Sequence, residues 1–251
     1  MGKCYFLADV HLGLQVGDTT ARERRLVDFL EGLDAAQTEA VFLLGDIFDF
    51  WYEYKYVIPR GHTRVLGALI HLTDRGIPVH FFTGNHDIWT YGYLAQELGL
   101  QVHRGELYIT LGGKHFLLAH GDTMGRIPGK ARFLFGLFRS PWAQVPFSAM
   151  HPRWGMALGL AWSKHNRLAK GVTYTFRNEA EPVFQYAAAY PKPVDYCIIG
   201  HFHSPAECVL PGGGTLLVLG DWINNPDVIV FETAPVPSSL PQIERIRFRK
   251  D

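Results

Sequence analysis

The chain has 251 residues, of which 47% are hydrophobic and 19% are charged, enough to bury a sizeable core. Its 24 basic and 24 acidic residues cancel, so net charge gives no reason to expect a nucleic-acid partner. Three cysteines without a Cys-x-x-Cys spacing fit a reducing compartment. We find neither a signal peptide nor an apolar run near the ~20 residues of a membrane span, and expect a cytoplasmic protein.

Apolar runs and helical spacing alternate along the first hundred residues. We expect buried strands at 3–8, 40–45 and 78–84, separated by helices over 20–36 and 62–76. A strand–helix–strand–helix–strand order is typical of a parallel sheet whose strands are joined by crossover helices. The first part of the chain is therefore predicted to be an α/β unit.

Tight turns dominate the sequence after a short predicted helix over 91–99. The stretch 107–121 reads as a hairpin around Gly112 and Gly113. Further strands are expected at intervals over 195–233, and the alternating tail 243–249 predicts an edge strand.

The segment from about 127 to 190 interrupts this pattern. It is rich in Phe, Trp, Leu and Ala at helical spacing, so we expect a helical lid inserted over one edge of the sheet, within a single domain spanning 1–251. From Thr123 to Asn178 the chain contains no acidic residue, while the rest of the chain has 24 acidic and 15 basic residues. The basic residues of that stretch are Arg126, Lys130, Arg132, Arg139, Arg153, Lys164, Arg167, Lys170 and Arg177.

Polar side chains follow the ends of the predicted strands. In α/β sheets such ends gather at one edge, where ligands bind. The residues concerned are Asp9, His11, Asp46, Asp49, Asn85, His86, His120, His201 and His203.

Carboxylates, an amide and several imidazoles together form a typical ligand set for borderline or hard divalent ions such as Mn, Fe, Zn or Ni. The lack of cysteine among them argues against a structural zinc site. In Asp-x-His and His-x-His, alternate residues project to the same side of an extended segment and can reach one ion. The pattern predicts two metal ions bridged by one carboxylate.

Five motifs, Asp-x-His, Gly-Asp-x-x-Asp, Gly-Asn-His, His-Gly-Asp and Gly-His-x-His, occur in this order between residues 9 and 203. In this respect the chain resembles the calcineurin-like metallophosphoesterases. That resemblance implies a four-layer αββα sandwich and two metal sites. The first ion would be held by Asp9, His11, Asp46 and His203, and the second by Asp46, Asn85, His120 and His201, with Asp46 bridging.

Within that superfamily, "FLADVHLG", "LLGDIFDFW", "FFTGNHD", "AHGDT" and "GHFHSP" are most similar to the UDP-2,3-diacylglucosamine pyrophosphatases of lipid A biosynthesis. The resemblance implies hydrolysis of that substrate to UMP and 2,3-diacylglucosamine 1-phosphate, with manganese as the expected metal. It also implies a lid that holds the acyl chains and peripheral association with the cytoplasmic face of the inner membrane. Oligomeric state is left open.

Substrate contacts are carried over from the same resemblance. In the lid, "SKHNRLAK" supplies Ser163, Arg167 and Lys170, whose spacing of four and then three residues places them on one helical face. Asn85, His86 and His201 are expected to contact the phosphate as well. The other reading of this helix face is a solvated basic surface.

Two departures from the pyrophosphatase pattern leave alternatives open. His86 stands where those enzymes have arginine, and the lid start "TMGRIPGKARF" lacks their acidic and tyrosine-bearing stretch. The chain could instead act on a soluble nucleotide or another phosphodiester, or serve as a catalytically silent scaffold. We interpret His86 as a proton donor or phosphate-binding cation, with Asp49 orienting it and Asp87 bracing the loop.

Overall fold

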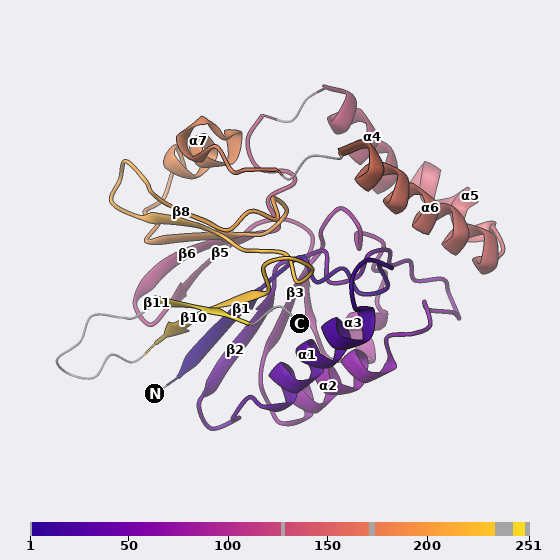
Figure 1. Ribbon diagram of the computed structural model, residues 1–251, viewed down its shortest axis with the longest axis horizontal. Coiled ribbons are helices and arrows are strands. Elements are labelled where there is room, and N and C mark those ends of the chain that lie inside the picture. Colours follow the sequence, from indigo (N-terminus) through magenta and orange to yellow (C-terminus); the bar gives the residue numbers. More distant parts are fainter. Residues whose placement is uncertain (1, 127–128, 171–173, 234–242, 249–251) are drawn as a thin grey trace.

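The computed structural model describes residues 2–126, 129–170, 174–233 and 243–248, apart from the side chains at 130, 131, 135 and 164–170. Two β-sheets lie face to face, with helices on both outer sides (Figure 1). The first sheet has the order β11-β10-β1-β2-β3-β4. Its strands are β1 Lys3–Leu7, β2 Thr38–Leu43, β3 Val79–Phe82, β4 Gln101–His103, β10 Asp227–Glu232 and β11 Ile243–Arg247.

Strands β1 to β4 run parallel, and β10 and β11 add antiparallel at one side. The second sheet has the order β5-β6-β7-β9-β8, with β6, β7 and β9 parallel. Its strands are β5 Leu107–Leu111, β6 Lys114–Ala119, β7 Tyr196–Ile199, β8 Ala206–Val209 and β9 Thr215–Val218.

Helices α1 Thr19–Glu31 and α2 Thr63–Asp74 cover the first sheet, and α3 Tyr93–Gln96 follows β3. Helix α7 Pro182–Ala188, preceded by the short helix η1 Asn178–Ala180, packs on the second sheet. The order of layers is therefore helix, sheet, sheet, helix. The four-layer α/β sandwich expected from the sequence is confirmed.

Both faces of the central strands are apolar because successive side chains point to opposite faces and each face packs against a buried core. In β1, Phe6 points between the two sheets, where its ring centroid lies 4.8 Å from Phe42 and 5.7 Å from Phe116. Its neighbour Leu7 points to the other face and joins the cluster that contains Leu26 of α1. Side chains from the two faces thus fill two separate cores on either side of the first sheet.

The inserted segment differs in one respect from the expected lid. Helices α4 Gly129–Arg139, α5 Pro141–Ala149 and α6 Pro152–Lys170 project to one side of the sandwich (Figure 1), whereas α7 belongs to the outer layer on the second sheet. We use "lid" from here on for α4 to α6.

The lid rests on the segments that follow β2 and β3. The Tyr52 hydroxyl donates to the carbonyl of Gln144 at 3.2 Å, and the Trp89 indole donates to the carbonyl of Phe138 at 3.1 Å. The ring of Phe147 lies 4.7 Å from that of Tyr52. The lid is therefore anchored to the two segments that also carry predicted site residues.

Much of the remaining lid surface is apolar. Its exposed large hydrophobic residues are Phe133, Leu137, Trp142, Val145, Trp154, Leu158, Leu160 and Trp162. Despite this, none of the helices in the described residues combines the length and the hydropathy needed to cross a membrane.

Candidate metal centre

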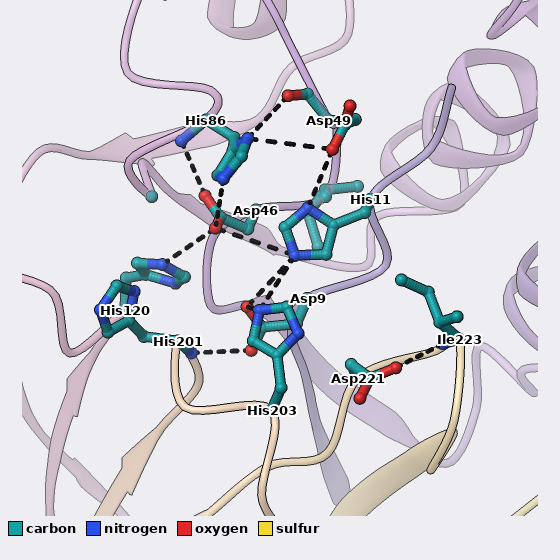
Figure 2. A network of polar contacts seen from close by, with 12 residues as sticks. Asp9, His11, Asp46, Asp49, His86, His120, His201, His203, Asp221 and Ile223 are labelled. Atoms are coloured by element: carbon teal, nitrogen blue, oxygen red, sulfur yellow. Dashed lines mark hydrogen bonds and ion pairs between the residues drawn. The ribbon is translucent and has the colours of Figure 1, made fainter. Parts of the chain in front are cut away.

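The loops that follow β1, β2, β3, β6 and β7 bring the predicted ligands together at one edge of the two sheets (Figure 2). Their histidine nitrogens and carboxylate oxygens form three overlapping groups, in each of which the donor atoms lie within 4.8 Å of one another. The groups are Asp9, His11 and His203; His11, Asp46 and His86; and Asp46, His120 and His201.

Backbone conformation also marks these positions. Six described residues other than glycine have a positive φ, and five of them are predicted ligands: Asp9, His11, Asp46, His201 and His203. The left-handed region costs an L-residue of order 1 kcal/mol or more, and such strain gathers at functional sites. This strained backbone conformation is found at the five residues whose donor side chains point into the site.

Close approach between loops depends on glycines. A Cβ on Gly84 would lie 2.2 Å from Asp46 Oδ1, and one on Gly200 would lie 2.5 Å from Asp9 Oδ2. At both positions the absence of a side chain supplies the space that the carboxylate occupies.

The first group of donors surrounds Asp9 Oδ1. This oxygen lies 3.4 Å from His203 Nε2 and 3.7 Å from His11 Nε2, and the two imidazole nitrogens are 3.2 Å apart. The other oxygen, Oδ2, accepts a hydrogen bond from the backbone N–H of His201 at 2.7 Å. Asp9 therefore has one oxygen held by the protein and one directed at the histidines.

Asp46 stands between the two halves of the site (Figure 2). Its Oδ2 lies 3.3 Å from His120 Nε2 and 3.9 Å from His11 Nε2, while Oδ1 accepts from the backbone N–H of His86 at 2.9 Å. His120 donates from Nδ1 to the carbonyl of Leu44 at 2.9 Å. In the neutral imidazole the lone pair is then on Nε2, the nitrogen that faces Asp46.

Buried polar atoms without partners test whether metal ions fit this set. Within the described part of the chain, Asp9 Oδ1, Asn85 Oδ1 and His120 Nε2 are buried and have no hydrogen-bond partner. Leaving such atoms unsatisfied costs roughly 1–3 kcal/mol each. All three belong to predicted ligands, so divalent cations fit the donor set chemically.

Burial and the neighbouring charged side chains shift the pKa values of Asp9 and Asp46 in opposite directions. Burial raises the pKa of Asp9 well above its usual range, and the nearby Asp46 carboxylate adds to the effect. Burial also acts to raise the pKa of Asp46, but the neighbouring His120 and His86 hold it well below its usual value. Two carboxylates this close favour bound positive charge.

His86 is oriented differently from our expectation. Its Nδ1 donates to the backbone carbonyl of Asp49 at 2.8 Å, whereas the Asp49 carboxylate oxygen Oδ1 is 3.9 Å away. That oxygen lies closer, at 3.6 Å, to His11 Nδ1. The Asp49 backbone thus orients His86, and the Asp49 side chain faces a predicted metal ligand.

Asp87 has the structural role expected from the sequence. It is fully buried and its carboxylate accepts from the backbone N–H groups of Gly84, Asp46, Ile47 and Phe48, at 2.7 to 3.3 Å. It ties the Gly-Asn-His loop to the loop that carries Asp46.

Two acidic residues near the site were not singled out from the sequence. Asp122 accepts from Arg139 of the lid at 3.3 Å, and Asp221 accepts from the backbone N–H groups of Ile223 and Asn224 beside Asp9 (Figure 2). Each follows a glycine at the end of an apolar run, "AHGD" and "VLGD", which is the signal that could have found them.

The three lid contacts predicted for the substrate have separate outcomes. Ser163 is 1% exposed and its hydroxyl donates to Asp49 Oδ2 at 2.9 Å, so the structure places it against the metal loops. The side chains of Arg167 and Lys170 lie outside the described residues.

Comparisons with known proteins agree with this geometry. The family model described as calcineurin-like phosphoesterase matches residues 2–205. The chain is 37% identical over 96% of its length to a UDP-2,3-diacylglucosamine hydrolase of Porphyromonas gingivalis, 99% of which is covered. It is 30% identical to the protein of the same name from Actinobacillus succinogenes, with both chains covered completely. The Vibrio cholerae protein of that name is 26% identical, with 90% of this chain and 93% of the relative covered.

Proposed function

The chain belongs to the calcineurin-like phosphoesterase family, and on this basis we propose that it hydrolyses the pyrophosphate of UDP-2,3-diacylglucosamine to UMP and 2,3-diacylglucosamine 1-phosphate. Support for the substrate comes from relatives of that name that match along nearly the whole chain. The chain carries every ligand of the predicted set, so the catalytically silent scaffold is set aside.

One observation carries the proposal: a two-carboxylate, multi-histidine donor set lies at the foot of a lid whose outer surface is apolar. A pyrophosphate needs positive charge, and acyl chains need an apolar partner. Exposed patches of this kind mark surfaces that bind apolar ligands or membranes.

Two divalent ions, manganese in our proposal, would be held as follows. Asp9, His11, Asp46 and His203 would hold the first, and Asp46, Asn85, His120 and His201 the second. When bound, such a pair polarises phosphoryl oxygens and makes a water nucleophilic near neutral pH. Hydrogen bonds from His201 N–H to Asp9 and from His120 to Leu44 would keep these ligands in place before substrate arrives.

His86 supplies the chain's own acid or cation. Its Nδ1 proton is committed to the Asp49 carbonyl, and its Nε2 lies 4.0 Å from Asp46 Oδ2, at the same end of the site as the bridging carboxylate. We assign it to the phosphate: it would donate a proton to the leaving oxygen or neutralise its charge. Asn85 and His201 would contribute to the same phosphate pocket.

Arg167 and Lys170 of the lid would contact the substrate and place positive charge beside it. The lid would also bring the protein to the cytoplasmic face of the inner membrane. Trp142 is 90% exposed and Trp154 is 68% exposed, and indole rings favour the membrane–water interface. The basic residues between Thr123 and Asn178 would add attraction to anionic lipid.

The proposed substrate is tested by measuring the release of UMP. The purified protein with Mn²⁺ is given UDP-2,3-diacylglucosamine in detergent micelles, and UDP-N-acetylglucosamine, which lacks the acyl chains, in the same micelles. We expect rapid release of UMP from the first alone. Equal turnover of both would point to a soluble nucleotide substrate and contradict the proposal.

A further inference from the structure

Helix α6 meets the rest of the protein through three small residues. Among its residues up to 163, where side chains are described, the buried positions are Gly155, Gly159 and Ser163. They are spaced four apart, about one helical turn, so they share one side of the helix. This side faces the segment 49–54, which follows β2 and contains Asp49.

The contact is close enough to require glycine. A Cβ on Gly159 would lie 2.3 Å from the ring of Phe50, which is itself 6% exposed. A Cβ on Gly155 would lie 2.0 Å from the Tyr54 hydroxyl. Larger side chains at these positions would force either the helix or these rings to shift. The backbone of α6 is therefore packed closely against side chains of the loop that leads out of the metal centre.

This seating delivers one hydrogen bond to the metal loops. The buried Ser163 hydroxyl donates to Asp49 Oδ2 at 2.9 Å. The second oxygen of the same carboxylate lies 3.6 Å from His11 Nδ1, on the opposite side of the imidazole from the Nε2 that faces Asp9 and Asp46. Ser163, Asp49 and His11 thus form a continuous line from the lid to a predicted ligand.

A carboxylate behind a metal-bound imidazole fixes the ring's tautomer and direction and strengthens it as a ligand. The carboxylate can do this only while its own rotamer is fixed. Asp49 Oδ2 is fixed by a residue that is 114 positions away in the sequence and belongs to the lid.

We propose that Ser163 is a positioning residue through which the seating of the lid helix α6 sets the affinity of the Asp9–His11–His203 site for its metal ion. The inference rests on the proposed two-metal function. Because coupling between two equilibria is reciprocal, metal binding at that site also stabilises the seated lid. The lid and the metal pair then form one cooperative unit.

Metal dissociation constants test this without measuring turnover. Mn²⁺ affinities of the full chain are obtained by chelator competition for Ser163→Ala, Asp49→Asn, the double variant and Ser148→Ala. Ser148 is an exposed lid serine whose hydroxyl donates to the carbonyl of Val145, and it is the matched control. Loss of a carboxylate behind an imidazole ligand typically weakens metal binding 10- to 100-fold, so we expect a loss of about that size for Asp49→Asn at one of the two sites.

For Ser163→Ala, which acts one step further out, we expect about three- to tenfold weaker binding at the same site. The double variant should bind no more weakly than Asp49→Asn, because Ser163 acts through Asp49. Gly159→Ala, which keeps the serine but places a methyl group against the Phe50 ring under the helix, should weaken the same site.

Two results would overturn the proposal: wild-type affinity at both sites in Ser163→Ala, or multiplying losses in the double variant. A wild-type chain that binds no metal would instead refute the two-metal function itself, so the two failures are distinguishable.

Hydrogen exchange reads the coupling from the other end. Mn²⁺ should slow amide exchange over residues 155–163 of α6 in the wild type and in Ser148→Ala, since opening of the lid then requires loss of a favourable contact. In Ser163→Ala the metal should have little effect on these amides. An equal effect of Mn²⁺ in both proteins would contradict the proposed link.

Discussion

Replacing His86 with alanine separates proton donation from metal binding. The imidazole is held by one side-chain hydrogen bond, from Nδ1 to the Asp49 carbonyl, and its side chain is 16% exposed. The hydrogen bond that His86 makes to Asp46, the proposed bridging carboxylate, comes from its backbone N–H, which donates to Asp46 Oδ1. Alanine keeps this N–H, so Asp46 and both ions should remain in place.

The expected loss in kcat for His86→Ala is roughly 10²- to 10⁴-fold, the range for removal of a general acid or base. That corresponds to about 3–5 kcal/mol of transition-state stabilisation. His86→Arg should recover part of the activity if positive charge is what matters, because the similar pyrophosphatases carry arginine at this position.

The assay compares two leaving groups. Turnover of the natural substrate and of a nitrophenyl phosphodiester is measured beside the metal content of each variant. A nitrophenolate leaves without a proton, so the defect of His86→Ala should shrink on that ester. Equal defects on both substrates, or loss of one metal equivalent, would refute the donor role.

Three further predictions follow from the geometry. Asp46→Ala should lose at least one metal equivalent and nearly all activity, because Oδ2 faces donors of both halves of the site; metal analysis showing two equivalents with normal turnover would contradict the bridge. Burial lowers the pKa of His62 and His80 to about 4, so each stays neutral in the folded protein while the unfolded chain binds protons below its ordinary value of 6.5. The contribution of these histidines to the free energy of unfolding should be complete above pH 6.5 and fall towards pH 4 by up to about 1.4 kcal/mol per pH unit for each histidine. Urea unfolding at several pH values should show that the free energy of unfolding of His80→Gln depends less steeply on pH than that of the wild type. An identical pH dependence in the two proteins would count against this prediction. Sedimentation with anionic vesicles should be reduced by salt and by replacing Trp142 and Trp154 with serine, but not by Tyr56→Ser, an equally exposed control outside the lid; binding insensitive to all of these would argue against a membrane-facing lid.

The parallel sheet and the gathering of the predicted ligands could be predicted for the same reason, whereas the four-layer sandwich followed from the family resemblance. Each long apolar run ends in a polar motif, and parallel strands bring those ends to one edge. The three-residue strand β4 was missed, because Gln101–His103 is too short to show a period. Helix α7 was assigned to the lid, because nothing in its local pattern distinguishes a helix that packs on the second sheet.

Side-chain partners were harder to predict than positions. Asp49 was expected to face His86. The sequence shows which strand each residue follows, but it does not show which side chains meet at the edge of the sheet. In the structure its carboxylate lies between His11 and the buried hydroxyl of Ser163. That contact depends on how closely α6 approaches through Gly159, a property of three-dimensional packing with no periodic signature in the chain.

Anomalous diffraction from crystals grown with Mn²⁺ tests the central claim, a metal pair shared by Asp46, most directly. We expect two peaks about 3.5–4 Å apart, one beside Asp9, His11 and His203 and one beside Asn85, His120 and His201, with Asp46 in reach of both. A single peak, or peaks away from Asp46, would contradict the dinuclear centre.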